Sequence, residues 1–160
     1  MLELVTINNQ NYEEIIALRV TEAQRDYVAG NDISLIEAYI ALSHGGHAFP
    51  FGLYDNGIPV GFLMIGYGVD EDWKDAPAVA RDNYSLWRLM IDERYQQRGY
   101  GSQAMALALS FLRSEPCGKA ACCWVSYDPE NRTAARLYSK YGFAETDEYD
   151  GNEVIAVKPL

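Results

Sequence analysis

Two apolar runs joined by an Asn-Gly dipeptide constrain the fold more than any other feature of this chain. The runs cover 48–55 and 58–69, and Asn56-Gly57 between them favours the tight turn of an antiparallel hairpin. The second run, IPVGFLMIGYGV, is apolar at successive positions, so both faces of its strand must be covered. The sequence therefore predicts a central strand in a sheet that has other elements packed on both sides.

The other elements are predicted from local patterns along the 160 residues. Short apolar runs predict strands at 2–7, 84–91 and 120–127, and turn residues at 150–152 predict a C-terminal hairpin. Helical spacing and capping residues predict helices at 11–20 (capped by Asn11), 33–43 (capped by Asp32), 101–114 and about 132–141. We expect one domain, 1–160, of the α/β class, with a mixed sheet and helices on its faces.

Charge and cysteine usage narrow the classes of function. The net charge of −10 argues against a surface for nucleic acid or an anionic membrane; it suits a cationic partner, although solubility alone also explains it. The cysteines Cys117, Cys122 and Cys123 are odd in number, which predicts buried free thiols rather than disulfides or a zinc site. His44 and His47 lack an obvious third ligand, so no metal is predicted.

The sequence also bears on the compartment. No apolar run approaches the roughly 18 residues that a membrane-spanning helix needs. The first residues, MLELVTINNQNYEE, lack the basic segment and the long apolar segment of a secretory signal. We therefore expect a cytoplasmic protein that does not enter a membrane.

The segment 92–102, DERYQQRGYGS, joins a predicted strand to a predicted helix. The first N–H groups of a helix have no internal partner and carry partial positive charge. Gly99 and Gly101 leave the backbone open to an anion, and Arg94 and Arg98 add positive charge. The turn suits a pyrophosphate, yet it matches neither the Walker pattern nor the dinucleotide fingerprint, and a Gly-x-Gly alone fits simple tight packing equally well.

Two segments taken together resemble one known family. The pattern Gln96-x-x-Gly99-x-Gly101 resembles the acetyl-CoA signature (Q/R-x-x-G-x-G/A) of the GNAT superfamily of N-acetyltransferases. NRTAARLYSKYGF, at 131–143, resembles the second signature of that family, and a predicted helix and strand separate the two segments as in the family. The resemblance implies a central, mostly antiparallel sheet of six to seven strands with helices on both faces. It also implies direct transfer of an acetyl group from acetyl-CoA to a primary amine, without a metal.

The resemblance further implies roles for individual residues. The amides of 97–102 would hold the pyrophosphate of acetyl-CoA, and the backbone of 89–91 and Asn131 would hydrogen-bond its pantetheine arm. Tyr138 would protonate the departing thiolate and is the predicted catalytic residue. The predicted acetyl-CoA-binding residues are Leu89, Met90, Ile91, Gln96, Gln97, Arg98, Gly99, Tyr100, Gly101, Ser102 and Asn131. From the residues alone, Asn131 also fits a helix cap and Tyr138 also fits a packed core position.

The acceptor amine must lose a proton before it attacks, so the site needs a proton acceptor. The segments GLYDNGIPVGF, IDERYQQRGYGS, ARLYSKYGF and DGNEVIAVKPL resemble the bacterial spermine/spermidine acetyltransferase group, and the acid-rich loop at 70–82 suits a polycation. That group often carries an acid in the strand before the pyrophosphate turn, whereas 84–91 has Trp87 and Arg88 there and no acid. The predicted replacements are Glu22, Asp26 and Asp82, of which the first two share a helix face if the first helix extends that far.

Three functions remain open at this point. The first is acetylation of a small amine such as spermine or spermidine, and the second is acetylation of a protein N-terminus or lysine. The third is a non-catalytic domain that binds acetyl-CoA as a sensor. An exposed apolar edge strand would also suit a homodimer, which is common in the superfamily.

Overall fold

Seven strands of the computed structural model, which describes all 160 residues, form one mixed sheet in the order β1-β2-β3-β4-β5-β7-β6. The strands are β1 (Leu2–Thr6), β2 (His47–Asp55), β3 (Ile58–Tyr67), β4 (Tyr84–Ile91), β5 (Cys122–Tyr127), β6 (Ala144–Asp150) and β7 (Glu153–Pro159). The helices are α1 (Tyr12–Ala17), α2 (Asn31–Ser43), α3 (Tyr100–Arg113) and α4 (Arg132–Lys140). Short 3-10 turns cover Glu22–Gln24, Ala78–Ala80 and Glu93–Tyr95. The predicted class and element order are confirmed.

The predicted hairpin forms the centre of the sheet. Asn56 and Gly57 have φ angles of 51° and 77°, so both turn residues are left-handed, and Asp55 pairs with Ile58 across the turn. Such a turn matches the right-handed twist of the two strands that it joins. Strand β3 therefore lies between β2 and β4, as its apolar sequence requires.

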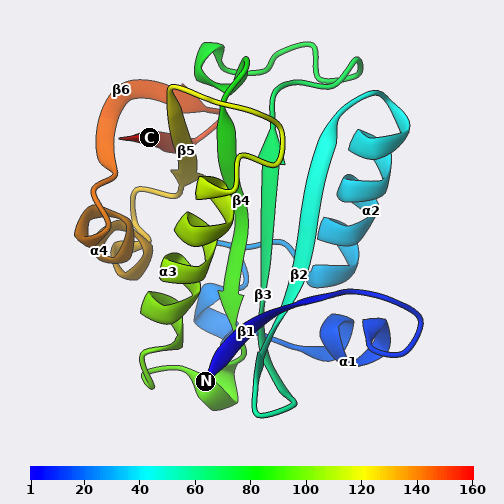
Figure 1. Cartoon of the computed structure of the whole chain (residues 1–160). Coiled ribbons are helices and arrows are strands. Elements are labelled where there is room, and N and C mark those ends of the chain that lie inside the picture. The colour runs from blue at the N-terminus through cyan, green and yellow to red at the C-terminus, as the bar shows by residue number, and fades with distance from the viewer.

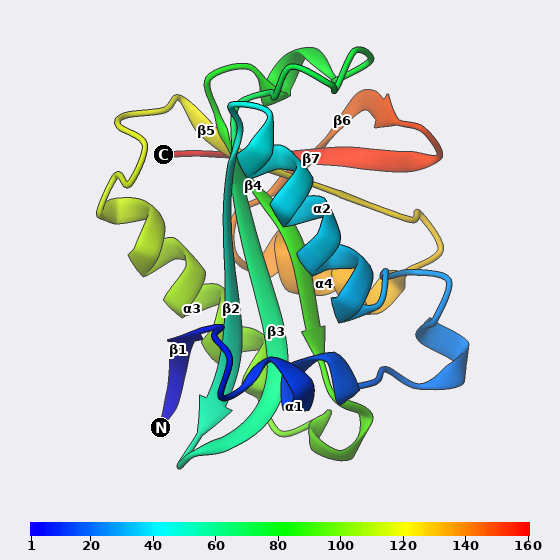
Figure 2. The same ribbon diagram turned by 90° about the vertical axis from the view of Figure 1, so that its right-hand side faces the viewer.

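Alternate side chains of β3 enter two separate cores. Phe62 and Met64 pack with α1 and α2, whereas Leu63 and Ile65 pack in the cluster that α3 supplies with Ala104, Met105 and Ala108. Helices α1 and α2 accordingly cover one face of the sheet, and α3 and α4 cover the other (Figures 1 and 2). The continuous apolar run of β3 is the direct cause of this three-layer arrangement.

Strands β4 and β5 are parallel but pair at only two positions, Tyr84 with Cys123 and Ser85 with Trp124. Beyond that point β4 contains a bulge, because Leu86 pairs with Ile65 and Arg88 pairs with Met64, which leaves Trp87 without a partner on β3. A bulge bends its strand and re-aims the side chains beside it. The remainder of β4 therefore has no strand partner on its β5 side.

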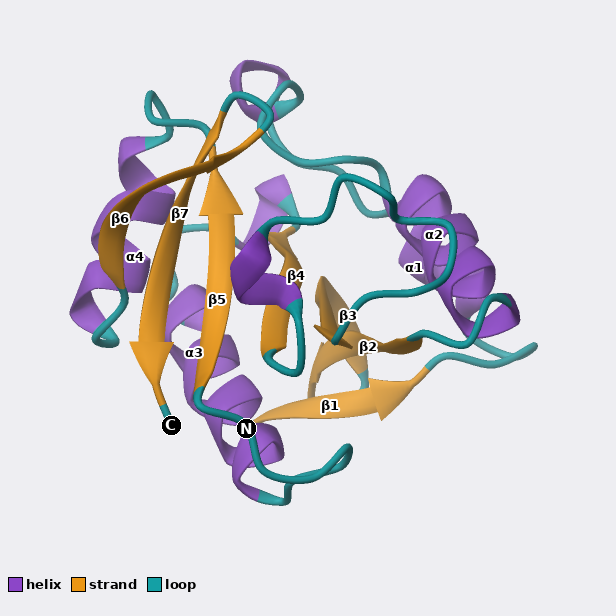
Figure 3. Cartoon of the chain, turned by 90° about the horizontal axis from the view of Figure 1, so that it is seen from above, coloured by secondary structure: helices purple, strands orange, loops and turns teal.

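The part of the sheet formed by β5, β7 and β6 has its own elements packed on each face. Figure 3 shows β5, β7 and β6 grouped apart from β1, β2 and β3, with β4 between them. On one face, α4 contributes Tyr138 to the main core; on the other, Trp73 and Ala80 pack over Trp124 and Ile155. The acid-rich loop at 70–82 is thus a packed wall over β5 and β7.

Two predicted helix starts need correction. Asn11 precedes α1 but caps nothing in it: its side chain donates to the Thr6 carbonyl (3.1 Å) and accepts from the Asn8 amide (2.8 Å). Helix α2 starts at Asn31 after Gly30, so Asp32 lies in the first turn and is not the cap. The Asn31 side chain is buried and donates to the Ile15 carbonyl at 2.8 Å, which ties α2 to α1.

Helix α1 ends at Ala17 and does not reach Val20, so the prediction for its C-terminal end is wrong. The Arg19 amide instead donates to Asp92 Oδ2 (3.0 Å), and the Glu93 amide donates to the Arg19 carbonyl (2.8 Å). Since these bonds require an extended chain at Arg19, tertiary contacts override the local preference for helix. Glu22 and Asp26 consequently do not share a helical face.

Candidate active site

A cleft of about 1130 Å³ opens where β4 and β5 separate. Its lining includes Leu89, Met90 and Ile91 of β4 and Trp124 to Tyr127 of β5. Side chains from both faces of the sheet reach it, since α2 and α4 both contribute to the lining. The cleft therefore passes through the gap in the sheet and is accessible to one reactant from each face.

The N-terminus of α3 forms one end of this cleft. Gln97 and Gly99 have φ angles of 61° and 81°, and Gly99 precedes the helix without any side-chain cap. No acidic side chain lies in the first turn, so the first amides of α3 and the partial positive charge of its helix dipole are uncompensated. A Cβ on Gly101 would lie no nearer than 3.6 Å to any atom outside its own helix, so space for an anion is present.

Most of the predicted acetyl-CoA-binding residues meet at this end of the cleft. All of them line it except Arg98, which is exposed and stacks over the Tyr95 ring at 5.5 Å. Tyr100 can offer only its amide, because its hydroxyl donates to Asp55 Oδ2 at 2.7 Å. Lys140 donates to Ser102 Oγ at 3.2 Å and so brings a positive charge to the start of α3.

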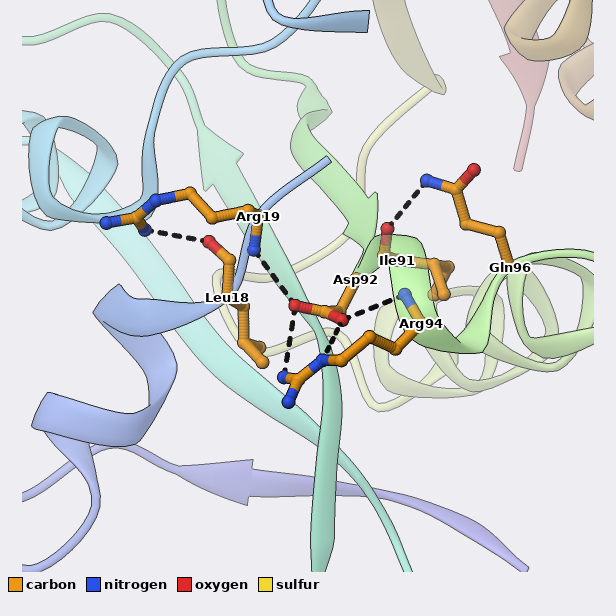
Figure 4. A network of polar contacts seen from close by, with 6 residues as sticks. All are labelled: Leu18, Arg19, Ile91, Asp92, Arg94 and Gln96. Atoms are coloured by element: carbon orange, nitrogen blue, oxygen red, sulfur yellow. Dashed lines mark hydrogen bonds and ion pairs between the residues drawn. The ribbon is translucent and has the colours of Figure 1, made fainter. Parts of the chain in front are cut away.

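The turn before α3 is held by internal hydrogen bonds (Figure 4). Gln96 donates to the Ile91 carbonyl at 3.0 Å and to Gln24 at 2.8 Å, so its side chain serves the turn itself. Asp92 is buried, and its carboxylate accepts from Arg94 Nε at 2.7 Å and from the Arg19 amide. Burial alone would raise the pKa of Asp92, but these donors hold it below its ordinary value. Arg94 is therefore engaged by Asp92 rather than directed to the anion site.

Asn131 and Tyr138 line the cleft from α4. Asn131 Oδ1 caps the helix by accepting from the Ala134 amide at 3.2 Å, which leaves its Nδ2 donor unused. The Tyr138 ring is buried between Tyr127 and Phe143, at centroid distances of 5.4 and 5.9 Å. Burial, followed by the nearby Glu153 carboxylate, raises the pKa of Tyr138 and keeps it a neutral phenol.

Only one of the three predicted acceptor-side acids reaches the cleft. Asp26 lines it, whereas Glu22 is exposed and lies 4.0 Å from Arg25. Asp82 is also exposed and does not line the cleft. It is a turn residue in the left-handed conformation, with φ of 60°. The predicted set of three acids is therefore not brought together by the fold.

Other acids line the cleft that the sequence did not single out. Glu37 of α2 accepts from Arg88 of β4 at 2.7 Å. The strand β4 itself carries no acid, but this contact brings a carboxylate from α2 next to it. Asp150 and Glu153 flank the turn between β6 and β7, and Asp70 and Asp72 come from the packed loop. No local signal marked Glu37, Asp150 or Glu153, because each becomes part of the site only through long-range packing. Asp70 and Asp72 belong to the acid-rich loop that the sequence had indicated.

None of the cysteines lines the cleft, whereas one of the two histidines does. All three cysteines are free, and burial raises the pKa of each thiol. His47 lines the cleft, while His44 pairs with Asp72 at 3.3 Å. The structure holds no group of three or more side chains arranged to bind a metal ion. None of its helices has the length and apolar character needed to span a bilayer.

Comparison with known proteins defines the class to which the fold and cleft belong. The pattern described as "Acetyltransferase (GNAT) family" matches residues 8–143, so this chain belongs to the GNAT family and is an acetyltransferase. It is 31% identical over 165 residues to the spermine/spermidine N(1)-acetyltransferase of Bacillus subtilis (strain 168), with 99% of both chains covered. The family predicted from the two sequence signatures is confirmed.

Solved structures agree with this fold at lower sequence identity. The PaiA N-acetyltransferase from Thermoplasma acidophilum, in complex with coenzyme A, is 15% identical with a TM-score of 0.68, covering 100% of this chain and 99% of that chain. The aminoglycoside acetyltransferase AAC(6')-Ib, also in complex with coenzyme A, is 15% identical with a TM-score of 0.74, covering 99% and 95%. At this identity the likeness establishes the common fold.

Proposed function

We propose that this protein transfers the acetyl group of acetyl-CoA directly to a primary amine of a linear polyamine such as spermine or spermidine. The observation that carries the proposal is the cleft through the sheet, whose lining includes both an uncapped helix N-terminus and a group of carboxylates. An anionic donor suits the helix N-terminus, and a cationic acceptor suits the carboxylates. The B. subtilis relative, named for its action on spermine and spermidine, supports the same substrate class.

The donor side would use main-chain groups for binding. The amides of 97–102 would hold the pyrophosphate, and the charge of Lys140 would assist them. The backbone of 89–91, which has no strand partner on its β5 side, would hydrogen-bond the pantetheine arm in the manner of an added strand. Nδ2 of Asn131 would donate to the same arm.

Tyr138 would donate a proton as the carbon–sulfur bond breaks. Its hydroxyl has no hydrogen-bond partner in the chain, whereas the hydroxyl of the neighbouring Tyr127 donates to Glu145 at 2.8 Å. The raised pKa of Tyr138 keeps its proton in place until a thiolate develops beside it. Tyr138 thus fits the role of general acid better than the neighbouring Tyr127 does.

The acceptor side would attract a polycation and align it. Asp26, Glu37, Asp70, Asp72, Asp150 and Glu153 line the cleft, against Arg25 and Arg88. Glu37 is already paired with Arg88, so the other carboxylates would meet the amines of the substrate. Exposed charge pairs weaken with added salt, so the affinity for a polyamine should fall as ionic strength rises.

An acetyl-CoA consumption assay across amines of different charge tests the proposal. Spermine and spermidine should show a kcat/KM at least roughly tenfold above that of 1-aminopropane, which has the same reactive group but lacks the additional charges. Kanamycin, amino acids and peptides with a free N-terminus or lysine complete the panel. Raising the salt concentration should raise KM for spermidine and leave KM for 1-aminopropane nearly unchanged.

The outcomes separate the three functions. A preference for lysine or N-terminal peptides would identify a protein acetyltransferase instead. Binding of acetyl-CoA without turnover of any amine would identify a sensor. Equal turnover of 1-aminopropane and spermidine at every salt concentration would contradict recognition of a polycation.

Three further predictions accompany the proposal: a single domain over 1–160, location in the cytoplasm, and a homodimer. Helix α2 supports the homodimer, because it exposes Ile33, Ile36, Tyr39, Ile40 and Leu42 by between 41% and 71%. The two edge strands are β1 and β6, and β6 bears mainly charged side chains. A dimer through α2 is therefore favoured over the apolar edge strand expected from the sequence.

A further inference from the structure

Glu153 is positioned by two strands at the edge of the gap in the sheet. It begins β7 and accepts a hydrogen bond from Ser126 Oγ of β5 at 3.1 Å. Val154 and Ala156 of β7 lie in the core that α3 and α4 cover, while Ile155 lies in the cluster under the packed loop. Because strand residues alternate between faces, Glu153 lies on the loop face, opposite to α4.

Tyr138 reaches the same cleft from the other face of the sheet. It is carried by α4, and both it and Glu153 line the gap. Burial and, after it, the negative charge of the Glu153 carboxylate raise the pKa of Tyr138. The gap thus has a carboxylate on the face that α2 and the packed loop cover, and a phenol on the face that α3 and α4 cover.

Four charged or titratable groups surround Glu153 from the neighbouring elements. Arg88 of β4 favours its ionised form, while Asp150 of β6 and Asp128 after β5 oppose it. Tyr138 faces it across the gap. Burial is the largest influence and raises the pKa of Glu153, although the Ser126 hydrogen bond partly offsets it. A carboxylate in this setting is a stronger base than an exposed one.

Asp150 is the other cleft carboxylate with a raised pKa, but its surroundings differ. After burial, the main cause is Asp75, a residue of the packed loop that does not line the cleft. No protein donor holds its carboxylate, whereas Ser126 fixes that of Glu153. Asp150 therefore suits attraction of a distal ammonium, whereas Glu153 suits a chemical role at the gap.

We infer that Glu153 is the catalytic residue that accepts the proton of the acceptor amine. This inference rests on the proposed function and deepens it, since the family pattern ends at residue 143 and does not include Glu153. The Glu153 carboxylate takes one proton from the substrate ammonium on its own face of the sheet. The freed lone pair then forms the carbon–nitrogen bond as the carbon–sulfur bond breaks toward Tyr138.

Protons and charge balance across the step. Tyr138 protonates the departing sulfur, and its phenolate recovers a proton, through water, from the nitrogen of the new amide. Glu153 releases the first proton to solvent when the products leave. An ammonium and a thioester thus give an amide, a thiol and one proton.

The test compares Glu153→Gln with Glu148→Gln, an exposed carboxylate of the neighbouring strand that does not line the cleft. With spermidine at pH 7.5, kcat/KM of Glu153→Gln should fall by roughly 10²- to 10⁴-fold, and that of Glu148→Gln should stay within about twofold of wild type. Because the variant must wait for neutral amine, its rate should rise about tenfold per pH unit up to the amine pKa. The wild-type rate should instead fall only as pH drops through the raised pKa of Glu153.

Stability and donor binding separate catalysis from folding. A raised pKa means that the contribution of Glu153 to stability is complete below its unfolded pKa and is lost as pH rises through its folded pKa. Glu153→Gln should therefore have a Tm at least equal to that of wild type at pH 8, with the difference shrinking toward pH 4. Its affinity for acetyl-CoA, measured by calorimetry, should be unchanged.

Each outcome bears on a distinct claim. A Glu153→Gln enzyme with wild-type kcat/KM and an unaltered pH profile would overturn the inference while leaving the proposed function intact. A lower rate accompanied by a lower Tm and weaker acetyl-CoA binding would also overturn it, because the role would then be structural. If spermidine is inactive but another amine reacts, the same comparison with that amine decides the role of Glu153. Wild-type protein without turnover of any amine would overturn both claims.

Discussion

Tyr138 is packed like a core residue, yet its hydroxyl has no hydrogen-bond partner in the chain. Its ring is 8% exposed and packs against two aromatic side chains, which fixes the direction of the hydroxyl. The hydroxyl nevertheless makes no hydrogen bond within the chain, and Tyr138 lines the cleft. Buried hydroxyls usually find a partner, so this one is free to donate to a group that arrives with the donor substrate.

Replacement of Tyr138 by Phe tests its role as general acid. The ring packing is retained, so Tm should change by only a few degrees, and the affinity for acetyl-CoA should be preserved. The value of kcat should fall by roughly 10²- to 10³-fold because the thiolate must leave without a proton. Steady-state kinetics and calorimetry check the two parts of the expectation.

The matched control is Tyr149→Phe, since Tyr149 is 59% exposed on β6 and does not line the cleft. It should leave kcat within about twofold of wild type. Unchanged turnover in Tyr138→Phe, with donor binding retained, would remove Tyr138 from the mechanism.

The charged partner of Arg88 could not be predicted from its neighbours in the sequence. In the linear chain, Arg88 lies in a strand where the related group often has an acid, and the replacements predicted from the sequence were Glu22, Asp26 and Asp82. In the fold, Glu37 lies 2.7 Å from Arg88, although 51 residues separate them in the chain. The acidity of this part of the cleft is set by helix packing, which a strand pattern cannot encode.

At the scale of elements, the start of α3 depends on two glycines that have different physical roles. Gly99 has φ of 81°, a conformation that is costly for a residue with a Cβ, although nothing lies within 4 Å of the position that a Cβ would take. Gly101 is inside the helix, and a Cβ there would be in ordinary contact with Leu137 at 3.6 Å. The first glycine sets the turn, whereas the position of the second has room for a methyl group.

The variants Gly99→Ala and Gly101→Ala should therefore shift stability in opposite directions. Gly99→Ala should lose about 1–2 kcal/mol through backbone strain. Gly101→Ala should gain up to about 1 kcal/mol through helix propensity. Urea unfolding measures both changes.

Acetyl-CoA binding gives the second readout of this pair. Gly101→Ala should bind acetyl-CoA nearly as well as wild type, because the family signature admits alanine there. Gly99→Ala should bind it at least roughly tenfold more weakly, since the turn amides would be redirected. Equal binding by the two variants would argue against an anion site on these amides.

The bulge in β4 was not foreseen and decides where the cleft lies. The strand was predicted with the correct bounds, since YSLWRLMI is plainly a β-strand sequence. Its pairing with β3 skips Trp87, and β5 is paired with only the first two residues of β4. The register of β4 depends on its pairing with both β3 and β5. The bulge therefore cannot be predicted from the sequence of any one of these strands.

At the scale of the whole molecule, α2 presents an apolar surface on a strongly acidic protein. Its exposed side chains include Ile36 at 55% and Tyr39 at 71% exposure. Two chains of net charge −10 repel one another, so they would meet with least repulsion through a face of this kind. The proposed homodimer would bury these side chains against a second copy.

The double variant Ile36→Glu/Tyr39→Glu should shift the protein toward monomer. Two carboxylates in the contact would face their symmetry mates, and the dimer dissociation constant should rise by at least roughly tenfold. Sedimentation equilibrium over a range of protein concentrations measures this constant. Ile58→Glu, at a residue that is 50% exposed in the β2–β3 turn, is the control and should leave it unchanged. A wild-type protein that is monomeric at all concentrations would contradict the dimer.

The sequence by itself determined the elements and the donor side of the site. Alternation, turn residues and capping signals act over a few residues, so strands, helices and the hairpin could be predicted, and the turn proposed to bind the pyrophosphate is one continuous segment. Only the tertiary structure decided the acceptor side. Glu37, Arg88 and Glu153 come from three separate elements, and the place where they meet depends on a bulge, a strand separation and the packing of α2. Local interactions fix a segment, whereas a site built from distant segments exists only after the chain has closed around it.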